Sequence, residues 1–99
     1  MSLTSKQRAH LRTLAHPMKP ILQVGAGGVS EAFVTSLEEA FQTRELFKVK
    51  VLENAPAKAK PTARAIAEAV QGVEIAQTIG RTIVLYREHP DSPEIDLDL

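Results

Sequence analysis

Apolar and polar positions alternate along the chain with two different periods. Three segments repeat apolar residues at the three-to-four-residue spacing of an amphipathic helix, and four are short apolar or alternating runs typical of strands. The predicted helices are residues 4–15, 31–43 and 63–71. The predicted strands are residues 21–24, 46–52, 73–79 and 82–87. This αβαβαββ order predicts an α/β fold, a two-layer sandwich of a small mixed four-stranded sheet with helices packed on one face.

The ends of the predicted helices carry residues that start and stop helices. Thr4 followed by Gln7 has the pattern of a capping box. Ser30 precedes the second helix as an N-cap, and Thr62 is expected to cap the third. Gly72 stands where a left-handed glycine ends a helix. Each helix therefore has at least one predicted boundary.

The strand at 46–52 has two chemically different faces. Phe47, Val49 and Val51 point to one side, and Lys48 and Lys50 point to the other. The lysine-bearing side is expected to face away from the helices.

The last two strands are separated by only two residues, Gly80 and Arg81. A two-residue Gly-X connection predicts a type II′ hairpin. The second of these strands is apolar throughout, so its pattern leaves the direction of Tyr86 open. An outward ring could stack on a nucleic-acid base, whereas a ring packed in the sheet is the simpler interpretation.

Composition places the chain among small globular proteins. Its 99 residues suffice for one domain, and the absence of Cys excludes disulfides, thiolate nucleophiles and Cys-ligated metals. No segment resembles a membrane helix or a secretory signal, so a cytoplasmic protein is expected. Residues 1–85 carry a net charge of +4, and residues 86–99 carry −4. We expect a basic domain over 1–87 and a mobile acidic tail over 88–99 that could lie against the basic face.

Such a charge distribution is compatible with a polyanionic partner and equally with an ordinary solvated surface. The one glycine cluster, Gly25 to Gly28, lies between a predicted strand and a capped helix. Backbone N–H groups in such a loop can bind phosphate, although any tight turn could need the same glycines. The cluster lacks the Lys-Ser/Thr of a nucleotide-binding P-loop and the third glycine of a dinucleotide site.

No catalytic or metal-binding set is evident. The three histidines, His10, His16 and His89, have no metal-ligand spacing, and no serine has a base near it in sequence. We therefore expect a protein that is not an enzyme and holds neither a metal nor a cofactor.

Three stretches, residues 11–20, 24–30 and 79–87, together resemble the CRM domain (chloroplast RNA splicing and ribosome maturation) in its free-standing bacterial YhbY-like form. They read LRTLAHPMKP, VGAGGVS and IGRTIVLYR, and the resemblance covers residues 3 to about 87. It implies an RNA-binding module similar in fold to the C-terminal domain of translation initiation factor 3. Bacterial members are associated with precursors of the large ribosomal subunit.

The family's Gly-x-x-Gly loop maps onto Gly25 and Gly28, where the residues alone already indicate a phosphate-binding turn. Family members often carry a basic or polar side chain inside this loop, whereas this chain has Ala26 and Gly27. We therefore expect backbone N–H groups to contact phosphates there, with a basic surface around them. The predicted RNA-binding residues are Gly25, Ala26, Gly27, Gly28, Lys6, Arg12, Lys19, Lys48, Lys50 and Arg81.

The expected partner is structured ribosomal RNA of large-subunit precursors, bound by a monomer. The alternative is a protein-interaction module that docks on a ribosomal protein or an assembly factor through the uncovered sheet face or the edge strands.

Overall fold

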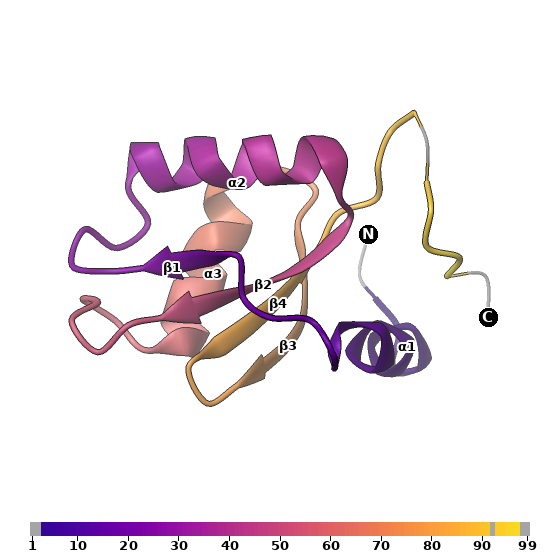
Figure 1. The fold of residues 1–99 in the computed structure, drawn as a ribbon, viewed down its shortest axis with the longest axis horizontal. Coiled ribbons are helices and arrows are strands. Elements are labelled where there is room, and N and C mark those ends of the chain that lie inside the picture. Colours follow the sequence, from indigo (N-terminus) through magenta and orange to yellow (C-terminus); the bar gives the residue numbers. More distant parts are fainter. Residues whose placement is uncertain (1–2, 92, 98–99) are drawn as a thin grey trace.

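A computed structural model describes residues 3–91 and 93–97 of the chain. Its helices are α1 (Ser5–Ala15), α2 (Glu31–Thr43) and α3 (Ala59–Ala69). Its strands are β1 (Leu22–Val24), β2 (Leu46–Val51), β3 (Glu74–Ile79) and β4 (Thr82–Tyr86). The strands form one sheet in the order β1-β2-β4-β3, with β1 parallel to β2 and the other pairs antiparallel (Figure 1). The α/β class, the element order and the mixed four-stranded sheet are confirmed.

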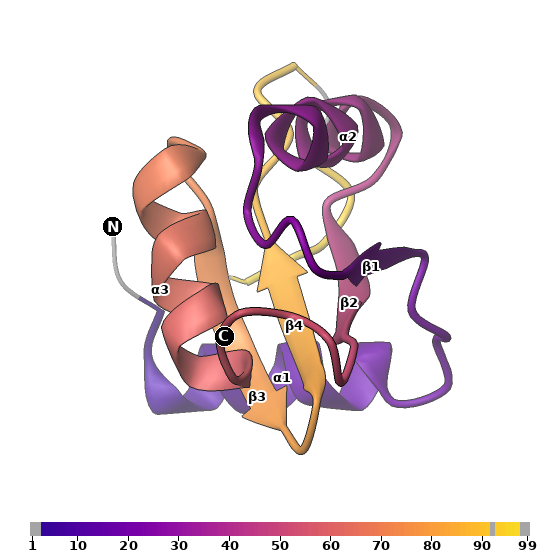
Figure 2. The ribbon, with the colours of Figure 1, turned by 90° about the vertical axis from the view of Figure 1, so that its left-hand side faces the viewer.

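The helices lie on both faces of the sheet, so the prediction that they share one face is wrong for α1. Figure 2 shows α2 and α3 on one side of the sheet and α1 on the other. The core cluster under α2 and α3 contains Phe47, Val49 and Leu85, whereas the cluster under α1 contains Leu46 and Val84. Because α2 and α3 connect strands that run parallel, the right-handed crossover rule constrains both to one face. Nothing in that rule constrains α1, which precedes the first strand.

Two of the three predicted helix starts are confirmed. The Thr4 hydroxyl accepts a hydrogen bond from the Gln7 backbone N–H, and the Gln7 side chain accepts one from the Thr4 N–H. The Ser30 hydroxyl accepts a hydrogen bond from the Phe33 N–H at the start of α2. The expected capping by Thr62 is wrong.

Helix α3 begins earlier, at Ala59, with Lys58 as its N-cap residue. Pro61 is accommodated in the first helical turn because the N–H groups of that turn have no intrahelical acceptor. Thr62 is buried inside the helix, and its hydroxyl donates a hydrogen bond to the Ala57 carbonyl. The third helix therefore begins four residues before the predicted start at residue 63 and includes Pro61.

Tyr86 belongs to the buried cluster beneath α1 and is 4% exposed, so the packed interpretation is confirmed. Burial, with the charges of Glu45 and Glu88, raises the pKa of Tyr86 to about 12. Its ring is therefore unavailable to stack on a base.

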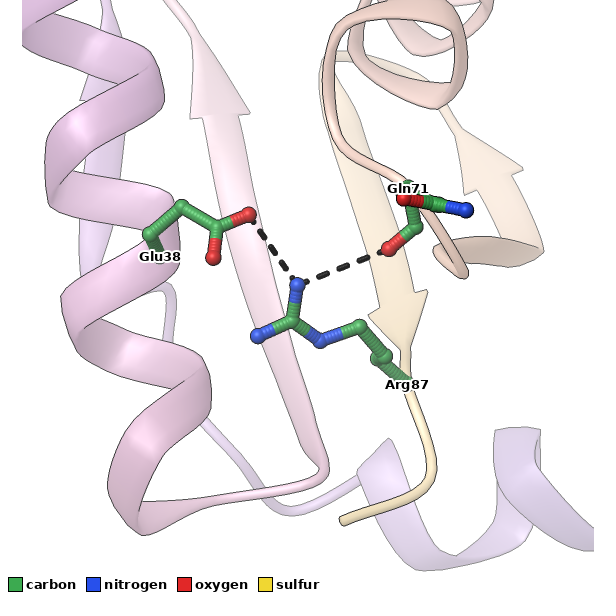
Figure 3. A network of polar contacts seen from close by, with 3 residues as sticks. All are labelled: Glu38, Gln71 and Arg87. Atoms are coloured by element: carbon green, nitrogen blue, oxygen red, sulfur yellow. Dashed lines mark hydrogen bonds and ion pairs between the residues drawn. The ribbon is translucent and has the colours of Figure 1, made fainter. Parts of the chain in front are cut away.

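Arg87 joins the two helices on the opposite face of the sheet. One guanidinium nitrogen donates to a Glu38 carboxylate oxygen on α2 at 3.0 Å and to the Gln71 carbonyl beyond α3 at 3.5 Å (Figure 3). The guanidinium carbon also lies 4.7 Å from the centroid of the Phe41 ring, a cation–π contact. These contacts hold the Arg87 side chain between α2 and α3.

The described part of the acidic tail, residues 88–91 and 93–97, packs against the domain instead of extending into solvent. The buried Glu45 carboxylate accepts hydrogen bonds from the backbone N–H groups of His89, Glu94 and Ile95 at 2.7–2.8 Å. Burial alone would raise the pKa of Glu45, but these donors and the nearby His89 ring outweigh it and lower the pKa. Ile95 and Leu97 pack on the cluster beneath α1. The expectation of a mobile tail is therefore wrong for residues 88–91 and 93–97.

Candidate nucleic-acid interface

The glycine loop forms a tight turn at the carboxyl end of β1. The Gly28 N–H donates to the Gly25 carbonyl at 3.0 Å, and Gly28 has a φ of +62°. A Cβ atom on Gly28 would lie 2.9 Å from Cγ of Pro56, whereas one on Gly27 would meet nothing within 4 Å. Gly28 is thus required by both conformation and space. Ala26 and Gly27 form the exposed tip of the turn.

The loop stands beside the ends of two other elements at one end of the sheet (Figure 2). The Leu52 N–H donates to the Val24 carbonyl at 2.9 Å, and the Val51 N–H donates to the Arg81 carbonyl at 2.7 Å. The end of β2 therefore lies between the loop after β1 and the tip of the β3–β4 hairpin. Gly80 has a φ of +57° and Arg81 does not have a positive φ, which is consistent with the predicted type II′ turn.

Arg81 forms an ion pair with Glu53, with 3.1 Å between a guanidinium nitrogen and a carboxylate oxygen. The two side chains are 56% and 80% exposed, so water and salt screen their attraction strongly. Such a pair can exchange its carboxylate for a phosphate at little cost in free energy.

A second cation at this end of the sheet was missed by the sequence analysis. Lys58 and Arg81 both line a cavity of about 420 Å³ that also includes Pro56 and Leu52. Lys58 lies between the predicted strand at 46–52 and the predicted helix at 63–71, outside every predicted element. The sequence showed only that Lys58 is basic. Its nearness to the glycine loop depends on the folded structure.

The predicted cations Lys48 and Lys50 lie on the α1 side of the sheet, so the expectation that their side faces away from the helices is wrong for α1, and Lys48 is half-buried there. Lys50 is exposed and pairs in register with Gln23, two residues before the glycine loop. Lys48 and Arg12 line one groove of about 870 Å³ between α1 and the sheet. The Lys48 Nζ donates to the His16 carbonyl at 3.3 Å. The structure thus places Lys50 beside the loop and brings Lys48 together with Arg12.

The remaining predicted cations lie farther out. Lys6 is exposed in the first turn of α1, six residues and about 9 Å of helix axis before Arg12. Lys19 is exposed in the connection from α1 to β1. Neither has a described contact with the loop. The ten predicted residues therefore fall into three groups: Gly25 to Gly28 with Lys50 and Arg81 at the loop end, Lys48 with Arg12 in the groove, and Lys6 and Lys19 farther out.

The acidic tail lies on the other flank of α1 from this groove. The Gln7 side chain donates to the Leu97 carbonyl at 3.1 Å, and Gln7 lies about 140° around the helix from Arg12. Figure 1 shows the tail at the opposite end of the molecule from the glycine loop. The prediction that the tail could lie against the basic face is therefore wrong for residues 93–97.

All four aromatic side chains, Phe33, Phe41, Phe47 and Tyr86, are buried. No Phe or Tyr ring is therefore available to stack on a base, and His16, exposed in the groove beside Arg12 and Lys48, carries the one imidazole ring in that groove. Within residues 3–91 and 93–97, no group of three or more His, Asp or Glu side chains could hold a metal ion. No helix in those ranges is long and apolar enough to cross a membrane.

Comparison with known families decides how this arrangement is classified. The model of the CRS1/YhbY (CRM) domain matches residues 3–87, from two residues before α1 to Arg87. The chain belongs to the CRS1/YhbY (CRM) domain family. The glycine turn and the Arg87 contacts described above are therefore features of a CRM domain.

Similar CRM proteins come from several bacteria. The chain is 42% identical over 95 residues to the Bacillus subtilis protein named Probable RNA-binding protein YqeI, covering 96% of this chain and 98% of that one. It is 34% identical over 86 residues to a Haemophilus influenzae protein named RNA-binding protein, covering 87% and 86%. The solution structure of Staphylococcus aureus SAV1595 superposes with a TM-score of 0.79 at 41% identity, covering 95% and 97%. The two curated relatives are thus named as RNA-binding proteins.

Proposed function

We propose that this CRM protein binds structured RNA without catalysing a reaction, and that its target is ribosomal RNA in large-subunit precursors. Membership of the family and the names of the relatives support RNA as the partner. The observation that carries the proposal is the exposed turn Gly25–Gly28 beside Arg81, Lys58 and Lys50. Three cations and the backbone N–H groups of one turn at the same end of a sheet suit the phosphate backbone of a folded RNA.

Chemically, the loop would act through its main chain. The tip at Ala26 and Gly27 is open to solvent and leads through Ser30 into the amino end of α2, where the helix dipole is positive. Phosphate contacts position a protein on a nucleic acid without reading its sequence. We therefore expect the protein to recognise the shape of the RNA. We also expect it to act as a monomer in the cytoplasm.

The test is binding of a protein-free large-subunit RNA fragment by the wild type and by Ala26→Asp/Gly27→Asp. Neither position has a positive φ, and a Cβ at Gly27 meets nothing, so the variant is expected to fold. The two carboxylates should repel phosphate and reduce affinity at least tenfold. The matched control is Gln42→Asp/Ala67→Asp, which adds the same charge at exposed positions of α2 and α3.

Equal losses in the loop variant and the control would refute a role for the loop beyond net charge. With about four phosphates neutralised, the logarithm of the binding constant should fall against the logarithm of salt concentration with a slope of about −3 to −4. Failure of the wild type to bind any RNA would favour the alternative, docking on a protein of the ribosome or its assembly.

A further inference from the structure

The α1 side of the sheet carries two rows of side chains across the strands near the glycine loop, and α1 covers the middle of the first row, where Val84 is fully buried. In one row Lys48 pairs with Val84, which pairs with Gln77. In the next row Gln23 pairs with Lys50, and the row continues through β4 to the outer strand β3. All these side chains lie on the α1 side because paired residues of neighbouring strands point to the same face.

Positive charge runs along the exposed part of this side, here called the open face, toward the glycine loop. Lys48 and Lys50 are two residues apart on β2, about 6.6 Å along the strand. This separation is comparable to that of successive phosphates in one nucleic-acid strand. Arg12 joins Lys48 in lining the groove, and no Asp or Glu lines it. The open face therefore has the charge to follow a sugar–phosphate backbone.

Two neutral side chains flank these cations. Gln23 is exposed on β1 next to Lys50, and Gln77 lines the groove on β3. Within the described residues, neither side-chain amide forms a hydrogen bond with the protein. A carboxamide both donates and accepts, as the ribose 2′-hydroxyl does. Each of these two amides can therefore form a hydrogen bond with a 2′-hydroxyl, which ribose has and deoxyribose lacks.

We infer that this open face binds the backbone of double-stranded RNA, with Gln23 and Gln77 hydrogen-bonded to 2′-hydroxyl groups and Lys48 and Lys50 beside phosphates. An A-form helix displays its 2′-hydroxyls in a wide, shallow minor groove that a flat sheet face can approach. All Phe and Tyr rings are buried, so these side chains offer no surface on which unpaired bases could stack. The inference rests on the proposed function, since it names the form of RNA bound beside the glycine loop.

The experiment compares a blunt-ended RNA duplex with a DNA duplex of the same sequence, using fluorescence anisotropy at fixed salt. The wild type should bind the RNA duplex about tenfold more tightly. Gln23→Ala/Gln77→Ala should lose about tenfold in affinity for RNA and leave affinity for DNA unchanged. The matched control Gln42→Ala/Gln71→Ala removes two amides from the other side of the sheet and should bind as the wild type does. Gln23→Ala alone, at an exposed position, gives the same test if the Gln77 change lowers stability.

A wild type that binds both duplexes equally, or a glutamine variant that loses RNA and DNA affinity alike, would overturn the assignment of the two amides. The proposed function would survive either result if Ala26→Asp/Gly27→Asp still weakened RNA binding. Conversely, a selective glutamine effect with no effect of the loop variant would uphold the open face and refute the loop. Absence of RNA binding by the wild type would overturn both proposals.

Discussion

Replacing Gly28 by alanine tests whether the conformation of the glycine turn limits the stability of the domain. In the native turn Gly28 has a φ of +62°, a region that L-residues with a Cβ atom rarely adopt. The added Cβ would also lie 2.9 Å from Cγ of Pro56, so the loop between β2 and α3 would have to shift. The same substitution at Gly27 meets neither obstacle.

The two positions should therefore respond to alanine very differently. The left-handed conformation costs an L-residue about 1–2 kcal/mol, and relieving the Pro56 contact adds to that, so we expect a loss of about 2 kcal/mol for Gly28→Ala. For a domain of this size, that lowers the melting temperature by about 8–16 °C. Gly27→Ala should change stability by less than about 1 kcal/mol and can stabilise the protein by restricting the unfolded chain.

Thermal and urea unfolding of the wild type and both variants, followed by circular dichroism, would measure these differences. Unfolding slopes in urea should stay the same if the native state is unchanged elsewhere. Equal melting temperatures for the two variants would refute the claim that the φ angle and Pro56 make Gly28 indispensable.

Three further predictions concern charges. Glu45→Gln should lower the unfolding free energy by about 1.5–3 kcal/mol at pH 7, because an amide cannot accept all three tail N–H groups. Folding lowers the pKa of Glu45 below its ordinary value of 4.5, so the difference in unfolding free energy between the wild type and Glu45→Gln should persist above that pH. The difference should vanish as acid protonates the native carboxylate, and a constant difference at all pH values would contradict this prediction. Arg87→Lys should destabilise by about 1 kcal/mol in urea unfolding, because lysine cannot contact Glu38, Gln71 and Phe41 together, whereas the exposed Arg64→Lys should be neutral. Lys50→Gln should reduce the salt slope of RNA binding by about one with unchanged melting temperature, and an unaltered slope would place the RNA elsewhere.

The sequence predicted the elements whose boundaries depend on local interactions. The capping pairs Thr4–Gln7 and Ser30–Phe33 act within one turn, so the starts of α1 and α2 could be read from adjacent residues. The start of α3 could not, because a proline ends a helix in its interior and is tolerated in its first turn. Nothing near Pro61 in the sequence distinguishes these two situations.

Contacts between distant residues account for the remaining differences. The apolar stripe of α1 shows which of its sides is buried but not which face of the sheet it covers. The tail is held by Glu45, more than forty residues earlier, and one glutamate among the 12 acidic residues of the chain carries no mark of burial. The basic residues of the candidate site were recognisable by type. Their division between the loop end and the groove depended on strand register.

The contact between the two end segments has a practical consequence for how this molecule can be handled. Leu3 and Leu97 belong to the same apolar cluster, and Gln7 is hydrogen-bonded to Leu97. These segments lie at the end of the molecule opposite the glycine loop (Figure 1). A fluorophore, an affinity tag or a surface tether attached at either segment would therefore hold the domain with its glycine loop facing the solution. Because the same segments lie side by side, a short peptide could join them into a ring without crossing the exposed loop.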